Sequence, residues 1–559
     1  MEHARIDPLS LSASPTGVYL GLTHSPYAPG VYENAPEGLA DYLSTGTVGN
    51  AASGRVAYAL DLKGPALTVD TACSSSLVAL HLAARALRAG DCTMALAGGV
   101  SFMATPYVFT EFRRRQGLAA DGRCKSFAAA ADGMGFAEGV GVLLLERLSD
   151  ARRAGHRVLA LVRGSAVGQD GTTNGLAAPN GLAQQQVIRQ ALADAGLPPD
   201  AVDAVEAHGS GSVFGDPVEA EALIAVYGKG RPADRPLLLG SYKSNVGHAA
   251  AAAGVGGVIK TVMALRHGRL PKTLHVDRPT PHVDWSAGAV SLLTESVPWP
   301  DTGRPRRAGV TAIGASGTNA HVILEQAPPG AGPAARGSAP AAEGSRAEPG
   351  PLPWVVSGRT PDALRAQAER LAALLDADPA PEAGRDPADL GYALAVTRSA
   401  FRHRAVLVAE RTADFRAGLA ALAAGEPAAC LVTGRRVTGG TAVFFPGPPP
   451  GADGLPPDAW RALAARFPVF RRALDEVCAL LDARLGDRLG RPLRALSPGG
   501  GDGGGDGGGP LPDDRDTWAG AVLFAGQTAL YRLAEACGLT PGQVAGTGLG
   551  EVAAAHAAG

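Results

Sequence analysis

Residues 1–325 alternate between strand-like and helix-like patterns, and this alternation most narrows the folds open to the chain. Short runs rich in Val, Leu and Ile at 66–70, 141–145 and 322–324 have the composition of buried strands. Apolar residues with helical spacing lie between such runs, as at 184–195. The pattern predicts one α/β unit over residues 1–325.

The composition changes after this unit. Residues 326–353 are dominated by Pro, Gly, Ala and Ser, and they predict a linker because they contain too few large apolar residues to bury a core. Residues 354–435 return to alternating strand and helix patterns, which predict a small α/β domain. A third segment, 440–559, contains a glycine-rich run at 499–509 that predicts a flexible loop.

Composition and charge exclude several classes of protein. The 559 residues carry 51 Lys and Arg against 53 Asp and Glu, so no basic surface indicates a nucleic acid or an anionic membrane as partner. The six cysteines form no C-x-x-C pair, which favours reduced thiols over a disulfide framework or a zinc site. Because the sequence shows no signal peptide and no run of 18 apolar residues, we expect a soluble, cytoplasmic chain.

Cys73 lies where a strand is expected to turn into a helix. The strand-like run ends at Asp70, and helical spacing of Leu77, Leu80 and Leu87 follows. A thiol at a helix N-terminus faces unpaired N–H groups, which favour the thiolate and lower the cysteine pKa. The sequence therefore predicts a nucleophile, although a lone cysteine is more often a small buried apolar residue.

Two histidines, His208 and His248, each follow a strand-like run and sit in a turn rich in Gly and Ser. Neutral imidazoles in such turns are able to donate two Nε2–H groups to one oxyanion, with Lys243 as an electrostatic neighbour. A metal site is an alternative, but the spacing matches no zinc pattern. A Cys–His hydrolase is another, although it needs one histidine with an orienting partner rather than two in equivalent turns.

The residues around these three side chains resemble the active-site motifs of β-ketoacyl synthases. The segments are Asp-Thr-Ala-Cys-Ser-Ser-Ser-Leu at 70–77, Glu-Ala-His-Gly-Ser-Gly-Ser-Val-Phe-Gly-Asp-Pro at 206–217 and Lys-Ser-Asn-Val-Gly-His at 243–248. Flanking segments at 122–133, 162–175 and 317–324 are similar to ketosynthase domains of modular type I polyketide synthases. The resemblance covers essentially all of residues 1–325.

This resemblance implies a five-layer thiolase-like αβαβα fold, a homodimer and decarboxylative Claisen condensation. Cys73 would take the growing acyl chain from an acyl carrier protein, and His208 and His248 would assist decarboxylation of a malonyl-type extender. The backbone N–H groups of Cys73 and Ala315 would form the oxyanion hole. The substrates would be carried on phosphopantetheine, with no covalently bound cofactor and no metal in the chain itself.

Several positions depart from the family's pattern. Ser210 and Ser212 stand where the family usually has threonines beside the phosphopantetheine arm, so a hydroxyl is retained. Ile313 replaces the usual aromatic residue of a glycine loop. The family domain also begins well before the equivalent of residue 2, so we expect the N-terminal part of the ketosynthase to be missing.

Residues 354–435 resemble the linker domain that follows a ketosynthase, and 440–559 resemble the start of an acyltransferase. The acyltransferase family exposes a serine in Gly-His-Ser-x-Gly, whereas this chain has Thr547 and Gly548 at the histidine and serine positions. Pro448, which has no backbone N–H, replaces a glutamine of the oxyanion hole. We therefore expect a truncated acyltransferase segment without a nucleophile.

Two hypotheses from different classes remain at this stage. The first is polyketide chain elongation by Cys73, His208 and His248, with acyl carrier proteins and other synthase modules as partners. The second is a catalytically incompetent fragment or scaffold remnant of a polyketide synthase. The intact catalytic set favours the first hypothesis, and the short N-terminus favours the second.

Overall fold

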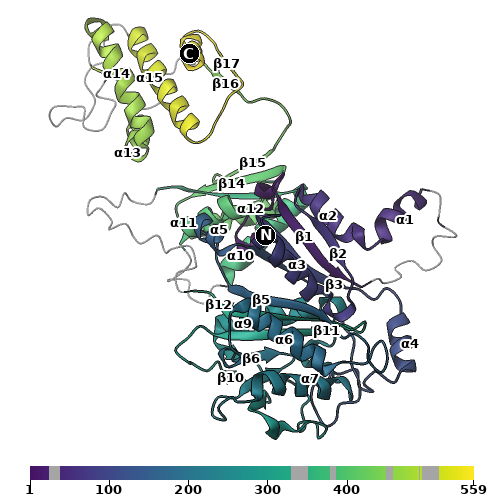
Figure 1. Ribbon diagram of the computed structural model, residues 1–559. Helices are drawn as coiled ribbons and strands as arrows, with labels where there is room; N and C mark the ends of the chain where they lie inside the picture. Colours follow the sequence, from purple (N-terminus) through teal and green to yellow (C-terminus); the bar gives the residue numbers. More distant parts are fainter. Residues whose placement is uncertain are drawn as a thin grey trace. The chain divides into compact units, whose positions relative to one another are not determined.

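The structure is a computed structural model (Figure 1). It describes residues 1–23, 35, 38–328, 350–377, 386–447, 457–489, 492–493 and 515–559. Contacts divide the chain into two compact units, residues 1–344 with 382–400 and residues 345–381 with 401–559. The glycine-rich run at 499–509 and most of the predicted linker at 326–353 lie outside the described residues.

The first unit contains a four-stranded sheet with the order β2-β1-β3-β4. Its strands are β1 (Thr16–Leu22), β2 (Ala66–Val69), β3 (Met94–Ser101) and β4 (Gly139–Glu146). β1 runs parallel to both β2 and β3, and β4 is antiparallel to β3. The strands predicted at 66–70 and 141–145 are therefore present, and both lie at the margins of this sheet.

A six-stranded sheet forms the other half of the unit, with the order β5-β12-β11-β6-β7-β9. Its strands are β5 (Ala160–Gln169), β6 (Ala204–Glu206), β7 (Leu237–Gly240), β9 (Val290–Leu292), β11 (Arg307–Ile313) and β12 (Thr318–Gln326). β6 runs parallel to β7 and to β11, while β12 is antiparallel to its neighbours β11 and β5. A two-stranded ribbon, β8 (Arg269–Leu270) with β10 (Val297–Pro298), lies outside this sheet.

The two sheets repeat one arrangement. The order and strand directions of β2-β1-β3-β4 match those of β7-β6-β11-β12. In the second sheet β5 covers the outer edge of β12, and β4 has no such neighbour among the described strands. Val140 and Val142 of β4 are accordingly 74% and 50% exposed.

Helices complete five layers (Figure 1). α3 (Ser75–Ala89) and α9 (Ala253–His267) contact each other and both sheets, so they form the central layer. α2 (Asn50–Leu60) covers the four-stranded sheet, and α6 (Gly181–Ala195), with its neighbour α7 (Gly215–Leu223), covers the six-stranded one. The predicted five-layer αβαβα fold is confirmed. α6 also contains the helical pattern noted at 184–195.

A short 3-10 turn carries Cys73 into the central helix α3. Cys73 lies in a 3-10 turn, Ala72–Ser74, and α3 itself starts at Ser75. The φ of Ala72 is left-handed at 54°, so a regular α-helix does not extend back to this residue. α3 ends at Ala89, and Gly90 after it has the same left-handed conformation, which glycine adopts without steric cost.

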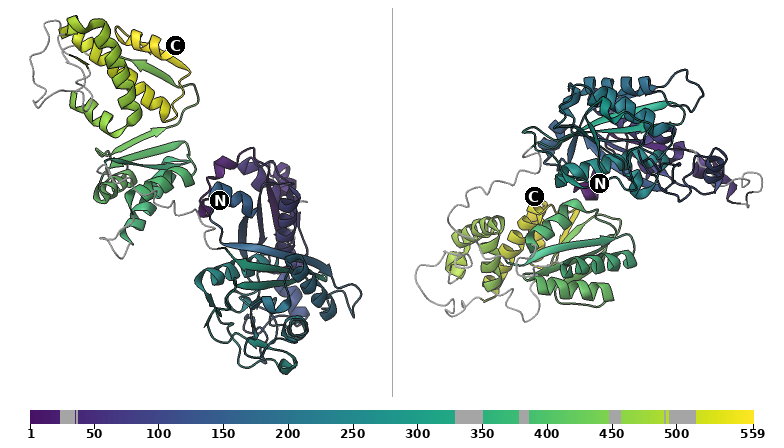
Figure 2. Two further views of the ribbon diagram at one scale, coloured as in Figure 1. Left: turned by 60° about the vertical axis from the view of Figure 1, so that its left-hand side comes forward. Right: turned by 90° about the horizontal axis from the view of Figure 1, so that it is seen from below.

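The second unit begins with a three-stranded antiparallel sheet of β13 (Leu352–Gly358), β14 (His403–Ala409) and β15 (Leu431–Arg435). α10 (Pro361–Asp376) and α12 (Thr412–Ala424) pack on it (Figure 2), with Trp354 stacked on Phe415 at 3.9 Å between ring centroids. α11 (Pro387–Thr397) belongs by its contacts to the first unit. The predicted 354–435 segment is therefore divided between the two units.

The remainder of the second unit has its own apolar cluster, built around Trp460, Phe470 and Trp518. Its helices are α13 (Pro457–Arg466), α14 (Pro468–Leu489), α15 (Arg515–Ala536) and α16 (Gly550–Ala558). Two parallel strands, β16 (Ala442–Phe445) and β17 (Gln543–Gly546), pack against α16. No helix among the described residues is long and apolar enough to cross a membrane.

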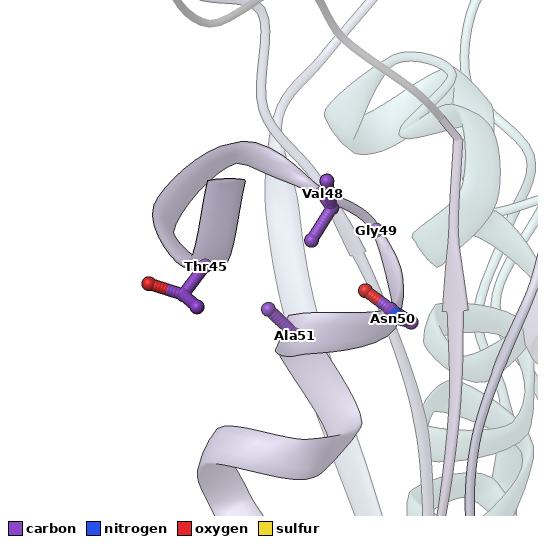
Figure 3. Close-up of a pocket in the computed structure, with 5 residues that line it drawn as sticks. All are labelled: Thr45, Val48, Gly49, Asn50 and Ala51. Carbon is purple, nitrogen blue, oxygen red and sulfur yellow. The ribbon is translucent and has the colours of Figure 1, made fainter. Parts of the chain in front are cut away.

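The remaining helices of the first unit are short. α4 (Tyr107–Arg114), α5 (Leu148–Ala154) and α8 (Lys243–Val246) connect strands, and α1 (Ala40–Thr47) precedes α2. A hollow of about 650 Å³ opens at the turn between α1 and α2 (Figure 3) and is lined by Thr45, Val48, Gly49, Asn50 and Ala51. None of these residues belongs to the three sequence motifs.

We predict that Gly21→Ala destabilises the first unit. A Cβ at Gly21 in β1 would lie 2.5 Å from the backbone nitrogen of Ser76, so the first turn of α3 would have to move. Such overpacking costs about 1–3 kcal/mol of unfolding free energy. The matched control is Gly54→Ala in α2, where a Cβ meets nothing within 4 Å and alanine should gain about 0.5–1 kcal/mol. Denaturant unfolding of both variants measures the difference, and equal stabilities would contradict the prediction.

Candidate active site

The fold brings the three motifs together at the carboxyl ends of parallel strands. Cys73 follows β2, His208 follows β6, and Lys243 and His248 follow β7. His248 Nε2 lies 3.1 Å from Cys73 Sγ. The imidazole rings of His208 and His248 meet edge to face, with 5.2 Å between centroids. Segments that are far apart in the sequence thus form one cluster.

Backbone donors fix the tautomer of both histidines. The N–H of Ala250 donates to Nδ1 of His248 at 3.2 Å, and the N–H of Ile313 donates to Nδ1 of His208 at 3.2 Å. Because Nδ1 accepts in each neutral ring, the proton resides on Nε2. Burial and the positive charge of Lys243 hold the pKa of each histidine well below its ordinary value. Both side chains are therefore neutral Nε2–H donors.

Cys73 is surrounded by hydrogen-bond donors. The backbone N–H groups of Cys73 and Ala315 both act on its sulfur and lower the thiol pKa, as does the charge of Lys243. Burial nevertheless outweighs them and raises the pKa of Cys73 above its ordinary value. The sequence-based expectation of a lowered pKa was wrong, because it counted the helix terminus and left out desolvation.

Lys243 connects the two histidine-bearing loops. Its Nζ donates to the carbonyl oxygen of His208 at 2.5 Å, and its side chain is buried. Burial lowers the pKa of Lys243, whereas the negative charges of Glu206 and Glu219 oppose that effect. Lys243 thus places a buried cation beside two imidazoles that must stay neutral.

Two carboxylates of α7 accept hydrogen bonds from the backbone of the His208 loop. Glu219 accepts the backbone N–H groups of His208 and Gly209 at 2.7 and 2.8 Å. Asp216 accepts those of residues 210, 211 and 212 at 3.1–3.2 Å, and also that of Phe127 at 2.9 Å. Burial raises the pKa of Asp216 to about 6 and that of Glu219 to about 7. Five consecutive N–H groups are satisfied in this way.

Neither carboxylate was identified from the sequence. A signal was present, because Asp216 and Glu219 follow the His208 turn within one helical turn of each other and face the same side. The predicted pantetheine-side residues lie in the same loop. Ser210 is buried, and the Oγ of Ser212 is half-buried and accepts the N–H of Gly215 at 3.0 Å.

An aromatic cluster that sequence reasoning missed borders the second histidine. Phe136 stacks on the His248 ring with 5.9 Å between centroids and 13° between planes. Phe109 and Phe112 of α4 contact Phe136 edge to face. These rings exclude water from one face of His248, which contributes to the desolvation that keeps it neutral.

The turn that we expect to correspond to an acyltransferase elbow carries a glycine at the predicted nucleophile position. Gly548 lies between β17 and α16 with a left-handed φ of 55°, and a Cβ there would meet nothing within 4 Å. The Oγ1 of Thr547 accepts the N–H of Gly447 at 3.3 Å. Pro448 lies outside the described residues. The strand–turn–helix geometry is therefore present around a residue that has no side chain.

Comparisons with known proteins agree with this geometry. Residues 1–151 match the β-ketoacyl synthase N-terminal domain, 159–277 the C-terminal domain and 279–408 the ketoacyl-synthetase C-terminal extension. The ketosynthase from module 6 of the bacillaene synthase of Bacillus subtilis is 33% identical, with a TM-score of 0.66 over 78% of this chain and 71% of that one. The chain belongs to the β-ketoacyl synthases of modular polyketide synthases.

Other relatives of this ketosynthase are a further ketosynthase domain and two polyketide synthases. The Streptomyces albus oxazolomycin ketosynthase domain is 36% identical, with a TM-score of 0.66 over 78% of this chain and 73% of that one. Polyketide synthase GfsB of Streptomyces halstedii is 54% identical over all of this chain and 10% of its own length. The spectinabilin polyketide synthase system protein NorC of Streptomyces orinoci is 53% identical, again over the whole chain. The chain spans 24% of NorC, so it covers a quarter or less of these two curated relatives.

We predict that Lys243→Met raises the pKa of Cys73. The Lys243 charge lowers that pKa, so its removal should move the pH midpoint of Cys73 alkylation upward. Iodoacetamide labelling across a pH series, with site quantification by mass spectrometry, measures the midpoint. The exposed Lys63→Met is the matched control and should leave it unchanged. An unchanged or lower midpoint in a folded Lys243→Met sample would contradict the prediction.

Proposed function

We propose that this ketosynthase elongates a polyketide chain by decarboxylative Claisen condensation. The observation that carries the proposal is the convergence of a thiol and two neutral Nε2–H imidazoles in one buried cluster. A hydrolase needs a base that accepts the thiol proton and activates water. Two imidazoles that donate suit a reaction in which negative charge develops on one carbonyl oxygen.

In the first half-reaction, Cys73 Sγ attacks the thioester carbonyl of an acyl chain carried on phosphopantetheine. The N–H groups of Cys73 and Ala315 stabilise the oxyanion of the tetrahedral intermediate. The carbon–sulfur bond to pantetheine breaks, and the pantetheine thiol leaves with the proton that Cys73 has lost. The product is an acyl-Cys73 thioester, which carries no charge and relieves the cost of a buried thiolate.

In the second half-reaction, the Nε2–H groups of His208 and His248 donate to the thioester oxygen of a malonyl-type extender. The bond to the carboxylate breaks, CO₂ leaves, and its electron pair forms an enolate whose negative oxygen receives both hydrogen bonds. The enolate carbon then attacks the acyl-Cys73 carbonyl. The new carbon–carbon bond forms as Cys73 leaves as a thiolate, and Lys243 offsets the charge.

Partners and substrates follow from this reaction. We propose acyl carrier proteins as donors of both substrates, other synthase modules as neighbours, a homodimer as the assembly and the cytoplasm as the compartment. Ser210 and Ser212 would border the phosphopantetheine arm. The elbow at Gly548 offers no nucleophile for acyl-enzyme chemistry, so the extender would be loaded by a different domain.

We predict that Cys73→Ala abolishes acyl loading and that His248→Ala separates the two half-reactions. His248→Ala should retain part of the acyl transfer to Cys73 but lose condensation at least about 10²-fold, as when an oxyanion donor is removed. Intact-protein mass spectrometry measures loading, and product mass with a malonyl carrier protein measures condensation. Cys430→Ala in the second unit is the control and should behave as wild type.

The outcomes distinguish the two hypotheses. A wild-type chain that folds cooperatively yet never acylates Cys73 would favour the incompetent fragment or scaffold. Condensation that persists in His248→Ala would show that the proposed role of this histidine is wrong.

A further inference from the structure

An ion pair between a buried carboxylate, Glu206, and a half-buried lysine, Lys260, adjoins the histidine loops and is not used in the condensation steps. Glu206 is the last residue of β6, two residues before His208, and is 5% exposed. Its Oε2 accepts the Nζ of Lys260, on the central helix α9, at 2.5 Å. Its Oε1 accepts the backbone N–H of Tyr242 at 2.6 Å.

These bonds make one carboxylate the junction of three elements. Glu206 ends the strand that positions His208, and Tyr242 immediately precedes Lys243 in the loop that carries His248. Lys260 anchors the carboxylate to α9. Tyr242 is fastened to the same helix a second time, because its hydroxyl donates to the carbonyl of Ala253 at 3.0 Å.

The same helix reaches the nucleophile. The backbone N–H of Val255 in α9 donates to Ser76 Oγ at 3.0 Å, and Ser76 lies in the first turn of α3, after Cys73. α9 thus contacts the segments that carry Cys73, His208 and His248, through Ser76, Glu206 and Tyr242 respectively. Of these three contacts of α9, the Glu206–Lys260 bond joins two charged groups.

The pair is tightly enclosed. A Cβ on Gly257 of α9 would lie 3.1 Å from Glu206 Cγ, so the carboxylate packs directly on the helix backbone. A cavity of about 20 Å³, lined in part by Lys260, Thr261 and Trp299, adjoins it and is large enough for about one water molecule. The carboxylate therefore has little freedom to find another partner.

Stability alone does not account for this pair. A buried ion pair is often no more stabilising than apolar residues of similar volume, because desolvation offsets the attraction. What the pair provides is geometry, since it fixes the Tyr242 backbone against the end of β6. Any shift there changes how the Nε2–H groups of His208 and His248 converge.

We propose that Glu206 and Lys260 form a positioning pair that aligns the two histidine loops for the decarboxylation half-reaction. The inference rests on the proposed function. Acyl transfer to Cys73 depends on the thiol and two backbone N–H groups, so misalignment of the histidine loops should affect it much less. The pair should thus act selectively on decarboxylation and condensation.

Lys260→Met is the test variant, because it keeps the aliphatic stem and leaves Glu206 unpaired. Condensation should fall by about 10- to 100-fold in kcat, the scale of an ångström-level misplacement, while acyl loading stays within about threefold. In the double variant Glu206→Gln with Lys260→Met, neither member of the pair carries a charge, Glu219 still acts on Lys243, and the amide oxygen still accepts the Tyr242 N–H. Condensation should recover there to within a few-fold of wild type.

Two controls distinguish the positioning role of Glu206 and Lys260 from the proposed condensation function. The exposed Lys229→Met should match wild type in both reactions. In ¹⁵N-histidine spectra without substrate, the Nε2 resonances of His208 and His248 should move in Lys260→Met and return in the double variant. That readout does not require condensation, so a wild type that fails to condense would refute the proposed function and leave this inference testable.

Three results would overturn the positioning role. One is wild-type condensation and unchanged histidine resonances in Lys260→Met. Another is a parallel loss of loading, condensation and thermal stability, which indicates a merely structural pair. The third is a double variant that folds as wild type without recovering condensation.

Discussion

Five consecutive backbone N–H groups after β6 point at the carboxylates of Asp216 and Glu219, and the rest of the site depends on this interaction. Without acceptors, these buried donors would carry a desolvation cost of about 1–3 kcal/mol each. With them, the loop holds His208 with its carbonyl oxygen toward Lys243. The position of the first histidine thus determines where the buried cation lies, and the cation in turn acts on Cys73 and His248.

Burial acts in opposite directions on the reactive groups. It keeps His208 and His248 neutral, which suits them to donate Nε2–H to a developing oxyanion. It also raises the pKa of Cys73, so the free thiolate is costly and the neutral thioester is favoured. Lys243 and two backbone N–H groups moderate this cost without removing it. Desolvation is therefore the common cause of the neutral, Nε2–H-donating state of the histidines and of the raised pKa of the cysteine.

The two units show that a backbone geometry suited to a reactive side chain can form with or without that side chain. In the first unit, parallel strands end beside Cys73, His208 and His248, and each side chain has partners that orient it. In the second, a strand–turn–helix elbow with a left-handed residue is formed, but Gly548 occupies the position where a nucleophile is expected. Backbone geometry can persist without its reactive group, because β17 and α16 are held by their own packing.

The sequence by itself determined the strand-like and helical segments of the first unit, the five-layer fold implied by its motifs, and the grouping of Cys73, His208 and His248. These features depend on local spacing and residue type, which are legible along the chain. Only the tertiary structure decided the tautomer of His208, because the donor to its Nδ1 is Ile313, which the fold brings near from 105 residues away. The donor to Nδ1 of His248 is Ala250, two residues away in the same turn. The tertiary structure also decided the direction of the Cys73 pKa shift and the roles of Asp216, Glu219 and Glu206. Those properties arise from desolvation and from contacts between distant segments, which spacing along one chain does not encode.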